Sequence, residues 1–408
     1  MHDRMANLDQ TLVAGIKGYA WLPDLRRKHH DRPVPLRVLG QRAVAVCGPE
    51  AVRFFYDESH VERHTALPHP VVATLFGKNA VHTLDGAAHR HRKALFVALL
   101  MNDGIDVLAK LVGESFDEAA ESWRGRSSVT LFDEAALVIA RAVTRWAGIP
   151  VTDDELPKLA ADLVAMVDGF ATPGPRHWRA LAARRRRERW LAAKIEGVRS
   201  GDVIAPADAA ITTIAHYRED GEPLEPRTAA VELINILRPA TAVAWFLAFS
   251  AHALDRWPQH RRPLRDGDDE FTAAFVHEVR RFYPFAPFLG GRAVEDLTFA
   301  GERIPKGALV LLDVYGQNHD NLLFPQPYEF RPERFVDRPI GEFDLIPQGG
   351  GDPRTGHRCP GEQITVALLG TLAQRLARLD YYLPPQDLSI NLSRIPARPA
   401  SDVEIVVP

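Results

Sequence analysis

The stretch Phe343-Asp-Leu-Ile-Pro-Gln-Gly-Gly-Gly-Asp-Pro-Arg-Thr-Gly-His-Arg-Cys-Pro-Gly-Glu362 surrounds Cys359, one of only two cysteines in the chain. Four glycines precede this cysteine in the stretch and one follows it, so the backbone can turn tightly and approach a flat ligand closely. His357 and Arg358 can place positive charge beside the sulfur, and we expect a helix to begin just after Gly361. Both features favour a thiolate, which is the form that ligates iron. An inert cysteine in a loop is the alternative when these residues are considered alone.

The composition of the chain is that of a soluble globular protein. Its 408 residues are 46% hydrophobic and 25% charged, and the formal net charge of −3 gives no sign of a nucleic-acid or anionic-membrane partner. The apolar stretch 239–254 is too short for a membrane span, which needs about 20 residues. The first residues lack the pattern of a signal peptide. We therefore expect a cytoplasmic protein with no membrane span and no nucleic-acid partner.

Helical periodicity dominates the first two thirds of the chain, and we find no internal repeat and no linker. The predicted helices cover residues 49–57, 89–100, 103–122, 131–147, 154–167, 177–199, 227–254, 271–282 and 361–379. Strand-like runs occur at 43–47, 308–312, 381–383 and 403–407. We expect the arginine-rich run 184–189 to be a solvated helix face. The pattern predicts one large, mainly α-helical body with small β-sheets, in a single domain over residues 1–408.

Two further patterns carry charge. Glu278 and Arg281 lie one helical turn apart, where side chains can pair, and Arg334 follows downstream in the segment 330–335. His89 and Lys93 occupy positions i and i+4, on one face of an expected helix. Taken singly, each of these residues is equally explained by an ordinary ion pair or an exposed basic side chain.

The helix expected over 227–254 carries Arg238 followed by Pro239 within an otherwise apolar stretch. Proline removes a backbone hydrogen bond and bends a helix. A buried arginine needs an anion, because an unpaired buried charge is costly. That anion is either a carboxylate elsewhere in the chain or a substrate carboxylate, which a guanidinium holds with two parallel hydrogen bonds. The residues alone leave both possibilities open.

The Gly-x-x-x-x-Gly-x-x-Cys-x-Gly pattern that ends at Gly361 resembles the haem-binding loop of the cytochrome P-450 superfamily. Residues 347–351 stand in place of the usual phenylalanine and spacing of that loop. The resemblance implies a P-450-like body that encloses haem b, with Cys359 as the ligand of the iron. It also implies that Glu278, Arg281 and Arg334 form a structural triad. The haem contacts that it implies are Arg63, His89, Lys93, His357, Arg358 and, as a further candidate, Arg92.

The segments 278–290, 311–320, 346–351 and 75–82, together with Arg238-Pro239, closely resemble the fatty-acid peroxygenase branch of this superfamily. The acid–threonine pair of ordinary monooxygenases is missing from the helix 227–254. The resemblance implies that Arg238, with Pro239 beside it, binds the carboxylate of a fatty acid. That carboxylate would act in place of the missing acid, and hydrogen peroxide would make a reductase unnecessary. The implied products are 2- and 3-hydroxy fatty acids, or a terminal alkene after loss of carbon dioxide.

His82 bears on the choice between these products. Hydroxylases of this branch usually carry glutamine at the matching position and alkene-forming members carry histidine, which can donate a proton near neutral pH. We therefore expect decarboxylation with hydroxylation as a co-reaction, although an innocent loop histidine is the alternative. The resemblance implies that Phe76 packs against His82 and the substrate, and Leu75 and Gly290 are further expected substrate contacts. Phe170, Phe285, Phe288 and Leu289 are expected to line the apolar channel, with ordinary core packing as the alternative. A reductase-dependent haem monooxygenase and a non-catalytic haem sensor or carrier are the competing functions.

Overall fold

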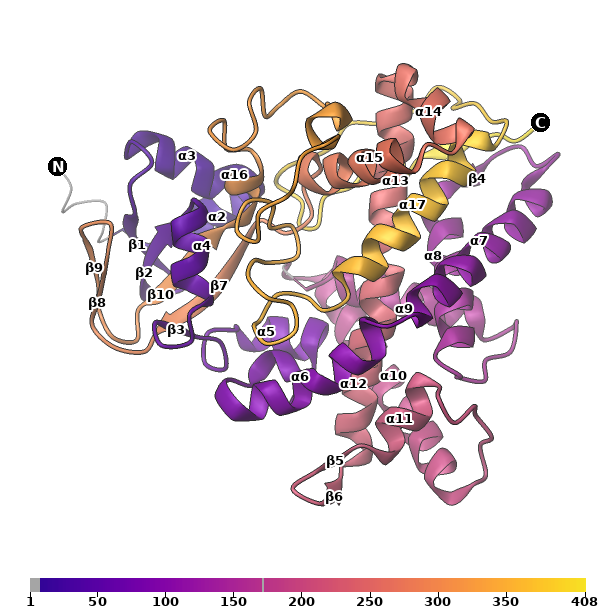
Figure 1. Cartoon of the computed structure of the whole chain (residues 1–408), viewed down its shortest axis with the longest axis horizontal. Coiled ribbons are helices and arrows are strands. Elements are labelled where there is room, and N and C mark those ends of the chain that lie inside the picture. The colour runs from indigo at the N-terminus through magenta and orange to yellow at the C-terminus, as the bar shows by residue number, and fades with distance from the viewer. Residues whose placement is uncertain (1–7, 171) are drawn as a thin grey trace.

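Helices make up most of the protein, and the computed structural model describes residues 8–170 and 172–408 (Figure 1). The longer helices are α6 (Gly86–Leu100), α7 (Gly104–Trp123), α8 (Leu131–Trp146), α9 (Leu156–Asp168), α10 (Pro175–Ser200), α12 (Pro226–Thr241), α13 (Val243–Arg256), α15 (Asp269–Phe282) and α17 (Glu362–Arg378). The shorter helices are α2 (Thr11–Lys17), α3 (Trp21–Lys28), α4 (Pro49–Tyr56), α5 (His69–Val71), α11 (Ala210–His216), α14 (Arg261–Asp266) and α16 (Val314–Asn318). Single turns form η1 (Gly18–Ala20), η2 (Val72–Phe76), η3 (Val81–Thr83), η4 (Pro258–His260) and η5 (Pro332–Phe335). The expected fold class, mainly α-helical with small sheets, is confirmed.

The largest sheet joins strands from residues 34–62 to strands from residues 288–313, in the strand order β1-β2-β10-β7-β3. Its strands are β1 (Val34–Val38), β2 (Gln41–Val46), β3 (Val61–Glu62), β7 (Phe288–Ala293) and β10 (Leu309–Asp313). All five residues of β10 are buried, which explains the apolar run 309–312, and the buried Asp313 at its end pairs with Arg26 at 2.9 Å. Because β10 pairs with β7 in the register Leu311↔Gly290, it positions the predicted substrate contacts of β7. Figure 1 shows this sheet beside α2, α3 and α4, at one side of the helical body.

The other sheets are pairs of short strands. They are β11 (Glu404–Ile405) with β4 (Val129–Thr130), β5 (Arg218–Glu219) with β6 (Glu222–Pro223), and β8 (Leu297–Phe299) with β9 (Glu302–Ile304). The strand expected at 381–383 is wrong, because only an isolated bridge from Tyr382 to Val406 forms there.

Helices α12 and α13 run through the core and carry the distal part of the candidate site. The stretch Pro226–Arg256 is long and apolar enough to cross a membrane, yet 94% of its apolar window is buried inside the protein, so it is a core helix. The single helix expected over 227–254 is divided at Ala242. Pro239 contributes to this break because it has no N–H to donate to the carbonyl of Asn235.

The arginine-rich run of α10 differs from its expectation. Arg184 and Arg187 are 1% and 5% exposed, so the prediction of a solvated helix face is wrong for these two residues. Arg184 pairs with Glu188 at 2.8 Å, and Arg187 pairs with Asp162 at 2.6 Å. Carboxylates on α9 and α10 therefore neutralise arginines that the local sequence could not distinguish from surface residues.

Candidate active site

The cysteine loop runs directly into helix α17. The N–H of Cys359 donates to the carbonyl of Gln348 at 3.1 Å, which closes the loop on itself. Gly349 has a φ of +99°, and a Cβ atom there would lie 2.4 Å from Oη of Tyr56, so the turn requires glycine. Burial raises the pKa of the Cys359 thiol, whereas a hydrogen bond from the Gly361 backbone and the charge of Lys93 lower it. A metal ion bound at such a sulfur deprotonates it outright.

Lys93 supplies the positive charge that we had expected from Arg358. The Nζ atom of Lys93 donates to the carbonyls of Gly356 and Arg358 at 2.9 and 2.6 Å, so it ties α6 to the cysteine loop. Burial lowers the pKa of Lys93 to about 8. The guanidinium of Arg358 instead donates to Glu362 at 2.7 Å. The prediction that Arg358 places its charge beside the thiol is therefore wrong.

Three buried basic side chains, Arg63, His89 and His357, lie next to this loop, and we call them the cationic cluster after Arg63, which carries the charge. Arg63 is 8% exposed and stacks over the Phe55 ring at 3.9 Å, and its Nε and Nη2 atoms have no hydrogen-bond partner among the described residues. The rings of His89 and His357 stack at 3.8 Å, and Nε2 of His357 lies 3.1 Å from Asp85. Burial lowers the pKa of His89 to about 3. Buried donors without partners call for an acceptor, so the cluster fits the propionates of a haem whose iron is held at Cys359.

Arg238 projects from α12 and is 7% exposed. Its Nη2 atom donates to Oδ1 of Asn235 at 3.3 Å, and its Nε atom has no partner among the described residues. No described carboxylate lies within salt-bridge distance of its guanidinium. Burial, with Arg184 close by, lowers the pKa of Arg238 to about 9, so the side chain is charged at neutral pH. Of the two anions left open by the sequence, a structural carboxylate is therefore excluded among the described residues.

The segment that carries Phe76 and His82 lies against this arginine. The rings of Phe76 and His82 are 4.4 Å apart, and the guanidinium carbon of Arg238 is 5.9 Å from the centre of the Phe76 ring. Burial and the charge of Arg238 lower the pKa of His82 well below 6.5, and its Nδ1 atom has no partner among the described residues. His82 is therefore neutral at pH 7, with one ring N–H as a donor.

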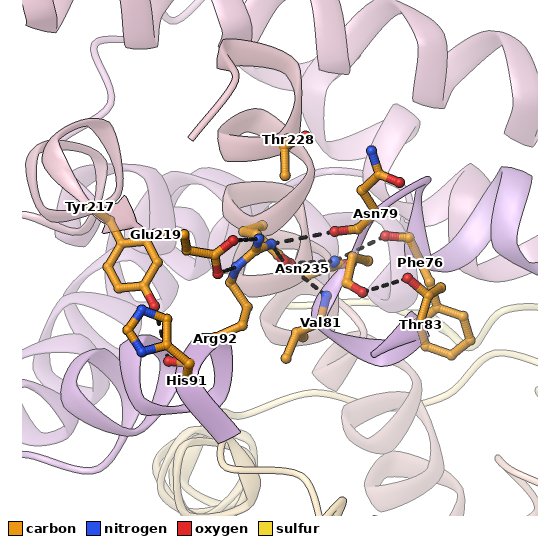
Figure 2. A network of polar contacts seen from close by, with 12 residues as sticks. Phe76, Asn79, Val81, Thr83, His91, Arg92, Tyr217, Glu219, Thr228 and Asn235 are labelled. Carbon is orange, nitrogen blue, oxygen red and sulfur yellow. Dashed lines mark hydrogen bonds and ion pairs between the residues drawn. The ribbon is translucent and has the colours of Figure 1, made fainter. Parts of the chain in front are cut away.

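Two charged side chains fix the position of this segment. Arg184 donates to the carbonyls of Leu75 and Phe76 at 2.7 and 2.8 Å. Arg92, which was a further candidate for a haem contact, instead pairs with Glu219 and donates to Glu232 at 2.6 Å, so that expectation is wrong (Figure 2). Both arginines therefore act on the distal side as anchors of protein structure.

The three residues of the expected structural triad lie together. Glu278 and Arg281 are 0% and 1% exposed, and Arg281 donates to both carboxylate oxygens of Glu278 at 2.7 and 2.8 Å. Arg334, from η5, lies 3.2 Å from the same carboxylate. Arg281 also donates to the carbonyls of Asn318 and Pro327, so the triad joins α15 to the chain that leads into the cysteine loop.

Comparisons with known proteins agree with this arrangement. A family model of cytochrome P-450 matches residues 269–387. A variant of cytochrome P-450SP alpha (CYP152B1) has a solved structure with 38% sequence identity and a TM-score of 0.95, and the match covers 98% of each chain. The chain belongs to the cytochrome P-450 family. Cytochrome P-450EX alpha (CYP152N1), solved with myristic acid, is 33% identical with a TM-score of 0.94, over 98% of this chain and 97% of that one.

Further relatives place this P-450 within its family. A variant of cytochrome P-450 OleT in complex with arachidonic acid is 36% identical with a TM-score of 0.95, over 98% of this chain and 96% of that one. Putative cytochrome P-450 139 of Mycobacterium tuberculosis is 26% identical over 347 residues, 76% of this chain and 79% of the relative. The chain spans only about a third of the first curated relatives, such as 30% of cytochrome P-450 4e5 of Drosophila mettleri, which is 29% identical over 35% of this chain. The expected fold and the resemblance to the fatty-acid peroxygenase branch are confirmed, and the family implies a haem iron ligated by a cysteine thiolate.

The remaining substrate contacts expected in this P-450 come from two regions. The ring centre of Phe285 lies 5.1 Å from that of Phe246, and the ring centre of Phe288 lies 5.6 Å from that of Trp21. Leu289 and Gly290 follow Phe288 on β7. The carbonyl of Gly290 accepts a hydrogen bond from Arg63 at 3.3 Å, so β7 adjoins the cationic cluster. Phe170 lies in the turn after α9 and is half-buried. The half-buried rings are consistent with an apolar channel, and their role stays a prediction.

Sequence reasoning missed Asn235, Glu232 and Arg184 of this P-450. The three-residue spacing of Glu232, Asn235 and Arg238 along an apolar helix was a usable signal, because such positions share one helix face. Arg184 had a similar signal in Glu188, four residues further on.

Proposed function

We propose that this chain is a hydrogen-peroxide-dependent fatty-acid peroxygenase acting at Cα and Cβ of long-chain fatty acids. Its products are a terminal alkene and 2- or 3-hydroxy fatty acids. The observation that carries the proposal is the buried Arg238, which has no carboxylate partner among the described residues. Two structural neighbours hold myristic acid and arachidonic acid, which supports a fatty acid as the ligand of this arginine.

The residues that would hold the haem are those of the cysteine loop and the cationic cluster. Cys359 would ligate the iron, and Arg63, His89 and His357 would face the propionates, with Lys93 holding the loop in place. When bound, a haem iron with a thiolate ligand supplies the chemistry that cleaves the O–O bond of hydrogen peroxide.

Arg238 would bind the substrate carboxylate with two parallel hydrogen bonds and so hold Cα and Cβ at the reacting end of the pocket. The segment 237–241, Leu-Arg-Pro-Ala-Thr, contains no acid next to Thr241. The carboxylate held by Arg238 would therefore hold and return the proton that an acidic helix residue moves in an ordinary monooxygenase. Phe76, against the guanidinium, would exclude water from this ion pair.

The neutral state of His82 contradicts the expected basis of its role, which was a proton donated near neutral pH. Its imidazole can donate one N–H hydrogen bond to a bound carboxylate or accept one, but it carries little positive charge at neutral pH. We propose that this contact favours decarboxylation, with hydroxylation as the co-reaction. The balanced reactions are RCH2CH2COOH + H2O2 giving RCH=CH2 + CO2 + 2 H2O, or a hydroxy acid and one water.

The test is a product analysis of the purified haem-loaded protein with a long-chain fatty acid and hydrogen peroxide, without reductase, by gas chromatography–mass spectrometry. We expect an alkene one carbon shorter, together with 2- and 3-hydroxy acids. Hydroxy acids alone would retain the peroxygenase and remove the role given to His82. Turnover that requires a reductase and does not occur with peroxide would identify a conventional monooxygenase.

A further inference from the structure

One face of α12 carries three polar side chains within the otherwise apolar stretch 229–240. Glu232, Asn235 and Arg238 are spaced by three residues and are 0%, 4% and 7% exposed. Glu232 is the only acidic residue of α12, and it lies six residues before Arg238, whose guanidinium binds the substrate in the proposed function. The side chain between them, Asn235, separates the two charges.

Both the nitrogen and the oxygen of the Asn235 amide form hydrogen bonds. Its Nδ2 atom donates to the carbonyl of Phe76 at 2.9 Å and to Glu232 at 3.2 Å. Its Oδ1 atom accepts from Nη2 of Arg238 at 3.3 Å. Because both of its acceptors are on the nitrogen side, the oxygen must face the arginine. One side chain thus joins the arginine to the segment that carries Phe76 and His82.

Glu232 is committed to other donors. It accepts from Nη1 of Arg92 at 2.6 Å and from the N–H of Val81, next to His82, at 2.8 Å. Figure 2 shows Arg92 reaching α12 with Glu219 on its other side. The charge of Glu232 is therefore neutralised by Arg92 of α6, and Glu232 forms no ion pair with Arg238.

We propose that Asn235 is a positioning residue that holds Arg238 and the Phe76–His82 segment as one unit, and that the Arg92–Glu232 pair keeps Arg238 free to select a carboxylate ligand over a neutral one. This inference rests on the proposed function, because it concerns the same arginine. The substitution Asn235→Asp replaces the amide nitrogen, a donor, by a carboxylate oxygen, an acceptor. An aspartate at this position cannot donate to Phe76 or Glu232, and it supplies an internal carboxylate that competes for Arg238.

The test compares the dissociation constants of a palmitic acid and a hexadecanol ligand at pH 8, from the haem absorbance shift of the haem-loaded protein. In Asn235→Asp we expect the acid to bind roughly 10- to 100-fold more weakly and the alcohol to change by less than about threefold. A merely structural role of Asn235 would weaken both ligands alike. Asn321→Asp is the matched control, since it adds the same charge on an exposed side chain outside the site and should retain the preference for the acid.

The Arg92–Glu232 pair supplies a second, independent variant set. Arg92→Met should reduce the preference for the acid, and the double variant Arg92→Met/Glu232→Gln should restore it, because the uncompensated carboxylate is then gone. These variants also test the proposal if Asn235→Asp fails to bind haem. An unchanged acid preference in Asn235→Asp, or no recovery in the double variant, would overturn the inference. A wild-type protein without any preference for the acid would instead overturn the proposed function itself.

Discussion

A buried arginine without a carboxylate partner should lower the stability of the ligand-free protein, and Arg238→Met measures this directly. The pKa of Arg238 falls from 12.5 to about 9 mainly through burial, and each pKa unit corresponds to about 1.4 kcal/mol. The difference of about 3.5 gives an upper limit of roughly 5 kcal/mol for the cost of the buried charge. Structural relaxation reduces this cost, so we expect the ligand-free variant to be more stable by about 1–3 kcal/mol.

Arg184→Met is the contrasting variant on the neighbouring helix. Arg184 is buried but paired with Glu188, and it donates to two carbonyls of the segment before Gly77. Its loss leaves those acceptors unsatisfied and should lower the free energy of unfolding by about 2–5 kcal/mol. We therefore expect Arg238→Met to raise the free energy of unfolding and Arg184→Met to lower it.

Thermal unfolding of the haem-loaded proteins, with and without a saturating fatty acid, is the assay. The wild type should gain about 2.7 kcal/mol at a ligand concentration of 100 times Kd, whereas Arg238→Met should gain almost nothing. The reasoning is refuted if Arg238→Met is destabilised as strongly as Arg184→Met, or if fatty acid stabilises it as much as the wild type.

Three further predictions concern the loop, the triad and the cationic cluster. His82→Gln should shift the products from alkene towards hydroxy acids, as measured by gas chromatography–mass spectrometry, and an unchanged ratio would remove His82 from the product choice. Glu278→Gln should lower the free energy of unfolding by about 3–5 kcal/mol in denaturant titrations, because Arg281 loses its buried partner, whereas Glu295→Gln at the surface should change it little. Although burial acts to raise it, hydrogen bonds from His357 and from the His64 and Arg63 backbone hold the pKa of Asp85 well below its usual value. Its stabilisation is thus complete above about pH 5 and fades as the pH falls towards the lowered value, so Asp85→Asn should cost more stability at pH 7 than at pH 3.

Local pattern was sufficient for much of the fold. The helix expected over 271–282 is observed as Asp269–Phe282, because its apolar face and the Asp268 side chain that caps its first turn are both features of the local sequence. Helix α3 was not expected, because its burial depends on a distant partner. Trp21 packs against Phe288, which lies 267 residues further along the chain.

In the candidate site too, features of the local sequence could be predicted and contacts between distant residues could not. Cys359, Arg238 and the pair Glu278–Arg281 could be named because their spacing carries the chemistry. The partner of Arg92 could not, since Glu232 lies 140 residues further along the chain and only the folded structure brings them together. The expected haem contact therefore proved to be an anchor of α12. The role of Asn235 depends in the same way on a carbonyl from a distant loop.

In the proposed function the substrate carboxylate both anchors the fatty acid at Arg238 and carries the proton of the reaction. The most direct measurement compares peroxide-driven turnover of a long-chain fatty acid with that of its methyl ester, at equal concentration and with the same haem-loaded protein. We expect conversion of the acid and none of the ester, because the ester can neither pair with Arg238 nor carry the proton. Conversion of the ester at a rate comparable to that of the acid would contradict this role of the carboxylate.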